Sequence, residues 1–337
     1  MPKKEGYVQV PVCELHGLAV SSLRRANVPP EEAEIIAESL VEADQRGVYT
    51  HGCVCLPRYI GLMNGGHMRA AAEYRMLRQT DAIAVWDGMR SSGQVLGNWA
   101  MKEAMRHART HGIGAVAVKG SNHFGAGAYY AQLAQKEGMI GIAMSTGSST
   151  MAPWGGADRL IGNNPVAVAV PAEKHVPVVL DMAQSVVAFG RITNMKKEGK
   201  TEIPAGWALD KDGVPTQKID DVYTVLPMQQ HKGFGTALIV DILAGILLGG
   251  ATGNRAGDDQ EGPGCLFIAI DIDSFGDRET FLKGMDARID ELKGSKIAPW
   301  AKAIYMPGEI ENNNMNEAAD TVWMMPQIVD DLRNLPR

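Results

Sequence analysis

Apolar runs that alternate with glycine or proline along the chain predict a mixed α/β protein. Five short runs are rich in β-branched and other apolar residues, as buried strands are, and cover residues 113–119, 139–144, 166–170, 176–180 and 265–271. Apolar residues at helical spacing predict helices at 98–111 and 126–136. A chain of 337 residues is long enough to bury a sizeable core, and we expect two subdomains.

A helix followed by a histidine is predicted near the amino terminus. Residues 30–43 begin with Pro30 and acidic residues and continue with apolar residues at helical spacing, and Gly47 is the expected stop. His51 follows in the sequence Thr50-His51-Gly52. Histidine is the side chain most easily poised near neutral pH, so one placed just past a rigid helix end suits a proton donor. The alternative is a capping or turn histidine without a chemical role.

Charge and hydropathy argue against nucleic-acid and membrane partners. The formal net charge is −6 and the pI is about 5.8, whereas a nucleic-acid binder needs a basic face. The most apolar stretch, residues 237–248, contains Asp241. It is shorter than the roughly 20 residues that span a bilayer, so we expect a core helix. The lysines near the amino terminus are followed by no apolar run of signal-peptide length.

Four scattered cysteines are too few for a disulfide framework in a chain of this length, so we expect reduced thiols and a cytoplasmic protein. His51, Cys53 and Cys55 nevertheless form a cluster of the residue types that bind zinc. Structural zinc sites pair such a cluster with a second, distant pair of ligands, and the sequence shows no second pair. We therefore predict no metal, with Cys53 and Cys55 as small packing residues.

The residues alone do not establish a nucleotide site. No Gly-x-Gly-x-x-Gly follows a predicted strand and opens a helix, and Lys232-Gly233-Phe234-Gly235 only partly matches that motif. The polar, glycine-rich residues 251–264 predict a flexible surface loop. Phosphate binding there is disfavoured, because the acidic residues of the loop would repel an anion.

Eight short motifs in a fixed order carry a resemblance to a known family. They are Thr50-His51-Gly52, Gly120-Ser121-Asn122-His123-Phe124-Gly125, Ala152-Pro153-Trp154-Gly155-Gly156, Gly162-Asn163-Asn164-Pro165, Leu180-Asp181-Met182-Ala183, Ile203-Pro204-Ala205-Gly206-Trp207-Ala208, His231-Lys232-Gly233-Phe234-Gly235 and Pro307-Gly308-Glu309. The set resembles the malate/L-lactate dehydrogenase family, which includes ureidoglycolate, sulfolactate and diketogulonate dehydrogenases and ketimine reductases. The resemblance extends from about residue 31 to residue 309.

The resemblance implies a fold and an assembly. It implies a cofactor domain, residues 76–275, built on a largely antiparallel mixed sheet that is not of the Rossmann type. It also implies a helical lobe that carries substrate contacts and combines residues 1–75 with residues 276–337. The family usually forms homodimers, so a homodimer is expected.

The same resemblance implies hydride transfer between NAD or NADP and a small 2-hydroxy acid or 2-keto acid. His51 matches the family's catalytic histidine and would move the proton, while Thr50 replaces the serine of the family motif. Asp181 would orient His51 and stabilise its protonated form. His123 matches a second histidine that competes for the same role, and otherwise would polarise the substrate oxygen. The cofactor contacts implied by the motifs are Asn163, Asn164, Pro165, Lys232, Gly233, Gly308 and Glu309.

Two departures from the family pattern concern the substrate. The family usually has an arginine four residues after the catalytic histidine, where it binds the substrate carboxylate, and here that residue is Cys55. Asn163 stands where the family usually has threonine. We therefore expect an altered substrate, its anionic group held by Arg58 or Arg46. The alternatives are a cyclic ketimine reductase, a zinc-dependent hydrolase built on His51 and the two nearby cysteines, and a cofactor-binding protein without turnover.

Overall fold

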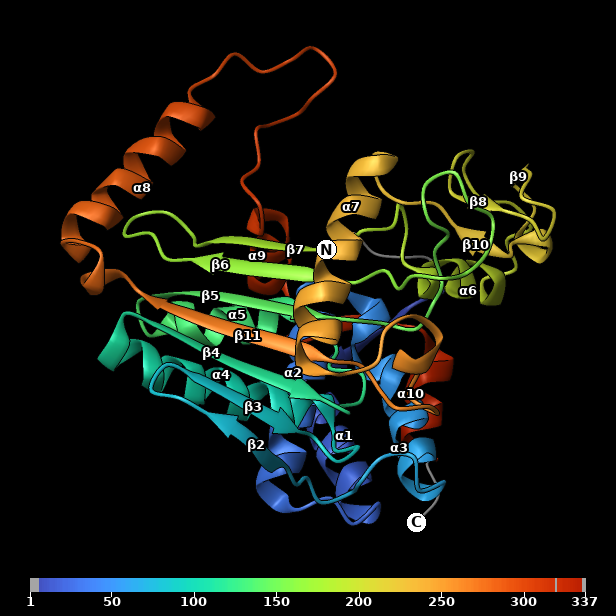
Figure 1. The fold of residues 1–337 in the computed structure, drawn as a ribbon. Helices are drawn as coiled ribbons and strands as arrows, with labels where there is room; N and C mark the ends of the chain where they lie inside the picture. The colour runs from blue at the N-terminus through green and yellow to red at the C-terminus, as the bar shows by residue number, and fades with distance from the viewer. Residues whose placement is uncertain (1–5, 319, 335–337) are drawn as a thin grey trace.

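A seven-stranded mixed sheet forms the centre of the computed structural model, which describes residues 6–318 and 320–334 (Figure 1). Its strand order is β2-β3-β4-β11-β5-β6-β7. The strands are β2 (Arg75–Gln79), β3 (Ile83–Asp87), β4 (Ile113–Lys119), β5 (Met139–Ser145), β6 (Val166–Val170), β7 (Val178–Met182) and β11 (Cys265–Asp271). Five of the six described pairings are antiparallel, and only β3 and β4 run parallel. The predicted fold class, a largely antiparallel mixed sheet with a helical lobe, is confirmed.

Helices cover both faces of this sheet. On one face lie α4 (Gly93–His111) and α5 (Gly127–Lys136), which confirm the two predicted helices between strands. Two strand glycines let these helices pack closely on the sheet, because glycine has no Cβ. A Cβ at Gly114 would lie 2.0 Å from the carbonyl oxygen of Ala104, and one at Gly141 would lie 2.1 Å from that of Ala131.

The opposite face is covered by one continuous apolar helical segment (Figure 1). It consists of α7 (His231–Val240), a π-helical turn η4 (Asp241–Gly245) and a 3-10 turn η5 (Ile246–Leu248). Residues 231–248 are long and apolar enough to cross a membrane by length and composition, but 39% of this segment is buried. The packing of Val240 and Ala244 against β4, β5 and β11 shows that it is a partly buried core helix, as predicted.

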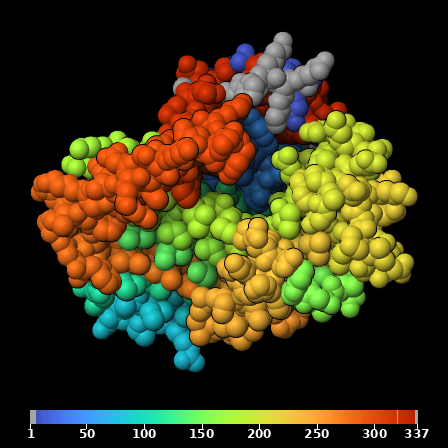
Figure 2. Space-filling view, turned by 90° about the horizontal axis from the view of Figure 1, so that it is seen from above, coloured from blue at the N-terminus to red at the C-terminus, as the bar shows by residue number. Residues whose placement is uncertain are grey.

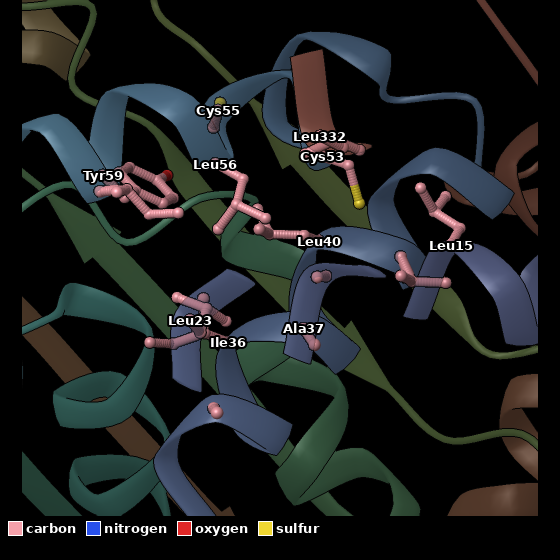
Figure 3. Packing of buried hydrophobic residues seen from close by; sticks show 14 of the residues in the cluster. Leu15, Leu23, Ile36, Ala37, Leu40, Cys53, Cys55, Leu56, Tyr59 and Leu332 are labelled. Carbon is pink, nitrogen blue, oxygen red and sulfur yellow. The ribbon is translucent and has the colours of Figure 1, made fainter. Parts of the chain in front are cut away.

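The amino- and carboxy-terminal segments pack together as a helical lobe around one buried cluster (Figure 3). β1 (Val8–Pro11) pairs antiparallel with β12 (Thr321–Met324), and α1 packs on α10. The helices of this lobe are α1 (Val12–Arg25), α2 (Pro30–Gln45), α3 (Leu56–Asn64), α9 (Glu309–Glu317) and α10 (Pro326–Arg333), with 3-10 turns η1 (Tyr49–His51) and η2 (Cys53–Cys55). Helix α2 confirms the predicted helix at 30–43.

Helix α8 (Arg278–Lys293) lies apart from this lobe, beside the hairpin of β6 and β7 (Figure 1). The Asp286 carboxylate accepts hydrogen bonds from the backbone N–H groups of Lys174 and His175 in that hairpin. Residues 294–308 then return across the molecule to α9. The division of the chain into a helical lobe (1–75 with 276–337) and a cofactor domain (76–275) stays a prediction. Helix α8 belongs to the predicted lobe by sequence, but it contacts the β6–β7 hairpin of the predicted cofactor domain.

A small sheet of order β10-β8-β9 forms a further unit, with its own buried cluster around Met151, Ile192 and Val225. It consists of β8 (Ala208–Leu209), β9 (Pro215–Thr216) and β10 (Thr224–Val225), and α6 (Phe189–Lys197) and η3 (Ile219–Asp221) lie beside it. The remaining 3-10 turns are η6 (Gly253–Ala256) and η7 (Ile272–Ser274). In Figure 2 the face seen from above is hollowed between this unit, in yellow-green, and α8 with the following segment, in orange.

Candidate active site

The loop that carries His51 rests on a buried carboxylate. Helix α2 ends at Gln45, and Gly47 adopts a positive φ of 81°, which turns the chain into η1. The carboxylate of Asp44, which is 1% exposed, accepts a hydrogen bond of 2.8 Å from the backbone N–H of Cys53. It also fills the space beside Gly52, where an added Cβ would lie 2.0 Å from Asp44 Oδ1. Glycine in the Thr-His-Gly motif is therefore required by the acid beneath it.

His51 lies half-buried on the wall of a cavity. Its Nδ1 is 2.8 Å from the hydroxyl oxygen of Thr50, so the hydroxyl that replaces the family serine fixes the ring. Burial is the main reason that the pKa of His51 is lowered to about 4, and the positive charge of Arg58 is the second. The imidazole is therefore neutral at physiological pH.

His123 lies beside His51, with 5.5 Å between the ring centroids. Its Nδ1 is 2.6 Å from the hydroxyl of Tyr59, which projects from α3. Burial, with the nearby His51 and Arg58, keeps the pKa of His123 well below its usual value, while burial raises the pKa of Tyr59. The pair is therefore a neutral imidazole and a protonated phenol. The structure brings the two predicted histidines together, one from the helical lobe and one from the loop after β4.

The cavity beside His51 has a volume of about 550 Å³ and lies where several elements meet. The end of α2, the start of α5, the end of β7 and residues 305–311 all contribute to its wall. Seven of the predicted site residues line it: Arg46, Thr50, His51, Asn163, Pro165, Asp181 and Gly308. The other predicted residues, His123, Arg58, Asn164, Lys232, Gly233 and Glu309, do not.

Asp181 has a different immediate partner from the one predicted. Its carboxylate accepts a hydrogen bond of 2.8 Å from the backbone N–H of Ala128 at the start of α5, whereas His51 is bonded to Thr50. Burial raises the pKa of Asp181 to about 6, although this hydrogen bond and the charge of Arg46 oppose the rise. Asp181 therefore anchors a helix N-terminus on the cavity wall, and in the part of the chain that the structure describes no hydrogen bond joins it to His51.

The two arginines predicted to hold substrate both have acidic neighbours. Arg46 is buried, donates a hydrogen bond of 2.9 Å to Gln132, and lies 3.9 Å from Glu42. Arg58, at the start of α3, forms an ion pair with Asp258. Asp258 also accepts a hydrogen bond of 3.1 Å from the backbone N–H of His123.

Four predicted cofactor residues lie outside the cavity wall. Asn164 is fully buried, and its amide binds Gly147, Ala237 and Asp241, so no polar group of this side chain remains for a ligand. Gly233 fits closely against backbone, since its Cβ would lie 2.3 Å from the carbonyl oxygen of Met228. Glu309 pairs with Lys293, and Lys232 lies exposed in the first turn of α7. Asn164 and Gly233 therefore have clear packing roles in the structure.

The cysteines next to His51 pack in the core of the helical lobe. Cys53 and Cys55 are buried in the helical cluster of Figure 3, and the Cys55 thiol lies 3.3 Å from the carbonyl oxygen of Thr50. Burial raises the pKa of Cys55 to about 11, which keeps the thiol protonated. Within residues 6–318 and 320–334, no three His, Cys, Asp or Glu side chains gather in a way that could hold a metal ion. The arrangement gives no support to the zinc-dependent hydrolase.

Three residues of the site were missed in the sequence: Asp44, Tyr59 and Asp258. Asp44 lies in a helix end, where acidic residues are usually solvated, and Tyr59 has the spacing of an ordinary core residue of α3. Asp258 lies in the glycine-rich segment predicted to be a flexible surface loop; the segment is a loop with one 3-10 turn, but part of it, including residues 262–264, is buried and does not lie on the surface. Gly262 and Gly264 pack directly on backbone, and Ser121 donates a hydrogen bond to the carbonyl oxygen of Pro263.

Comparison with known proteins places the chain among dehydrogenases with this non-Rossmann sheet. Its structure superposes on malate dehydrogenase from Pyrococcus horikoshii OT3 with a TM-score of 0.90 and 34% identity, covering 98% of this chain and 95% of that one. The sequence profile of the malate/L-lactate dehydrogenase family matches residues 10–333, and the chain belongs to this family. It is accordingly an NAD(P)-dependent dehydrogenase that acts on CH–OH groups.

Two curated relatives show the range of the family. Malate dehydrogenase from Pyrococcus abyssi is 39% identical over 319 residues, which covers 90% of this chain and 87% of the relative. L-sulfolactate dehydrogenase from Methanocaldococcus jannaschii is 35% identical over 326 residues, which covers 94% of this chain and 93% of the relative.

Proposed function

We propose that the protein oxidises a small 2-hydroxy acid, or reduces the corresponding 2-keto acid, with NAD or NADP as the hydride carrier. The observation that carries this proposal is the position of His51 on the wall of a cavity of about 550 Å³ that also presents Arg46 and Asn163. Small-molecule sites are commonly of this size. The names of the relatives, malate dehydrogenase and L-sulfolactate dehydrogenase, support the same class of substrate.

The cavity wall fits a nicotinamide cofactor. Asn163, Pro165 and Gly308 line it, and we assign these three residues to cofactor binding. Gly308 has a φ of +83°, and its Cβ would lie 2.7 Å from Val179 Cβ, so only glycine lets this segment lie against β7 along the cavity. When bound, the nicotinamide supplies the hydride-transfer chemistry, and the protein orients the substrate and moves one proton.

The two histidines suit different parts of that task. A neutral His51 whose Nδ1–H donates to Thr50 has a free Nε2 that can accept the proton of a substrate hydroxyl. For reduction His51 must be protonated first, and an anionic substrate beside it favours the charged form. Tyr59 stays protonated and can donate to His123 Nδ1, which leaves the opposite N–H of His123 to polarise the substrate oxygen.

We assign substrate binding to arginines other than the one that the family usually has at the position of Cys55. The protonated thiol of Cys55 supplies no charge where the family pattern has an arginine. Arg58 lies close enough to lower the pKa of both His51 and His123, so its guanidinium acts at the reacting end of the site. We assign the substrate carboxylate to Arg58, with Arg46 and Asn163 on the cavity wall contacting the rest of the molecule.

A nucleotide titration followed by a substrate panel tests the proposal. NADH and NADPH are titrated separately by fluorescence, and the preferred cofactor is then used with 2-hydroxy acids, 2-keto acids and cyclic imines. Turnover of a 2-hydroxy acid with either cofactor supports the proposal, and Arg58→Ala should then raise KM for that acid. Turnover of cyclic imines alone would assign the ketimine reductase instead. Tight cofactor binding without turnover of any compound would favour a binding protein.

We also propose a cytoplasmic homodimer. The exposed side of the α7 segment carries Ile239 at 53%, Ile246 at 59% and Leu247 at 68% exposure, an apolar surface suited to a second copy of the chain. Reduced thiols are consistent with the cytoplasm, since the four cysteines are free. Light scattering on the wild type and on Leu247→Asp tests the assembly: a monomeric wild type, or a dimer that Leu247→Asp leaves intact, would contradict this arrangement.

A further inference from the structure

Asp258 is a carboxylate fixed at the reacting end of the site, and neither the family pattern nor the proposed reaction accounts for it. It pairs with Arg58 and accepts the N–H of His123, so it contacts two residues assigned to substrate chemistry. Its side chain is 11% exposed, against 53% for Arg58. The carboxylate is therefore enclosed beside the arginine, whereas about half of the Arg58 side chain is exposed.

The segment that carries Asp258 is held firmly in place. The backbone N–H of Ser121 donates a hydrogen bond of 3.0 Å to the carbonyl oxygen of Pro263. The backbone N–H of Thr146 donates one of 2.9 Å to the carbonyl oxygen of Gly264. Gly262 has a φ of +84°, and its Cβ would lie 2.1 Å from the carbonyl oxygen of Ser121, so this contact admits no side chain. These contacts anchor the end of the segment that carries Asp258, and Arg58 and the backbone N–H of His123 hold the carboxylate itself.

The charges around the substrate position do not suit a dianion. A molecule with two carboxylates needs a cationic or hydrogen-bonding partner for each. Arg58 is paired with Asp258, Arg46 lies beside Glu42, and Cys55 is an uncharged thiol. Each arginine thus has an acid already beside it, and a second substrate carboxylate near Arg58 would also face Asp258.

We propose that Asp258 is a specificity-determining residue that partly neutralises Arg58, so that the enzyme prefers 2-hydroxy acids with one carboxylate and a neutral polar end over dicarboxylates of the same size. This inference rests on the proposed function. Arg58 still binds the single carboxylate, because its exposed side is open. The second charge of a dicarboxylate is disfavoured by the like charge of Asp258.

Malate and its 4-amide, malamate, provide a matched pair of substrates that differ in one charge. We expect the wild type to have a higher kcat/KM for malamate. Asp258→Asn keeps an oxygen acceptor for the His123 N–H and removes the charge, so it should shift the ratio of kcat/KM toward malate by about tenfold. The shift should appear in KM, with kcat little changed. Asp259→Asn, an exposed neighbour in the same turn, is the control and should leave the ratio unchanged.

Ionic strength provides a second test that needs no variant. Salt screens repulsion between charges, so raising it from about 0.01 M to about 1 M should improve malate relative to malamate in the wild type. The opposite trend would show attraction of the second carboxylate and would overturn the inference. An unchanged ratio in Asp258→Asn, or an equal change in Asp259→Asn, would overturn it as well. A wild type that turns over no 2-hydroxy acid overturns the proposed function itself, which separates the two failures.

Discussion

Replacing Asp44 by asparagine should make the protein more stable at alkaline pH than the wild type. Burial raises the pKa of Asp44 from the ordinary 3.8 to about 7, even though the Cys53 N–H favours the charged form. Among the described residues, no lysine or arginine pairs with this carboxylate. Folding is therefore disfavoured by ionisation of Asp44, and asparagine fills nearly the same space without a charge.

The magnitude follows from the displacement of the pKa. The folded state holds the proton more tightly than the unfolded state, so the stability of the wild type falls as pH rises from about 4 to about 7. A displacement of about three pH units, at about 1.4 kcal/mol for each, gives a limit of about 4 kcal/mol. The advantage of Asp44→Asn should be small near pH 4 and approach this limit above about pH 7.

Thermal unfolding of both proteins at several pH values measures this difference, because contributions of other groups largely cancel. At about pH 8 we expect the unfolding midpoint of Asp44→Asn to exceed that of the wild type by up to roughly 6 °C. Asp212→Asn, which changes an exposed acid, should show no pH-dependent difference. A gap between wild type and Asp44→Asn that is the same at about pH 4 and about pH 8 would refute the reasoning.

Four further predictions concern the site. His51→Gln should lower kcat by about 10²- to 10⁴-fold while leaving NADH affinity unchanged, and a fall of less than about tenfold would remove His51 from proton transfer. The pKa of His51 is lowered to about 4, so protonation of His51 should not reduce kcat/KM for oxidation as pH falls from about 8 to about 5. A decrease in kcat/KM centred near pH 6.5 that is absent in His51→Gln would contradict this assignment. The lowered pKa also means that the wild type loses stability as pH falls through about 6.5 toward 4, and His51→Gln should lose less over that range, as acid denaturation curves would show. Gly308→Ala should weaken cofactor binding by about tenfold or more, whereas Gly206→Ala, with a similar φ but open space around it, should not; equal titration curves for both would refute the steric argument.

The strands that the sequence predicted most accurately are those with a continuous apolar pattern. The ranges 113–119, 166–170 and 265–271 coincide with β4, β6 and β11, because these strands are apolar except for the last residue of β4 (Lys119) and of β11 (Asp271), and glycine or proline precedes each of them. β2 was missed because its five residues are all exposed, so no periodicity marks it. β8, β9 and β10 have two residues each, too few for any pattern. The placement of β11 between β4 and β5 depends on long-range pairing that local sequence does not encode.

For the site, the motifs identified residues but not their contacts. His51, Thr50 and Asp181 do meet at one cavity, as the resemblance implied. The partner of Asp181 is the start of α5, and that contact depends on how β7 and α5 are packed, which no motif states. Asp258 was missed because an acidic turn residue looks the same in sequence whether it faces solvent or an arginine.

The pairing of β1 with β12 joins Val8–Pro11 to Thr321–Met324, residues from opposite ends of the described chain. During synthesis strand β1 must therefore wait for its partner until residues 321–324 have left the ribosome, whereas the contacts of α4 and α5 with the central sheet become available earlier. The helical lobe that presents His51 is thus completed last. A nascent or truncated chain that ends before residue 321 would possess much of the sheet scaffold without a finished catalytic centre, which delays activity until β12 can pair with β1.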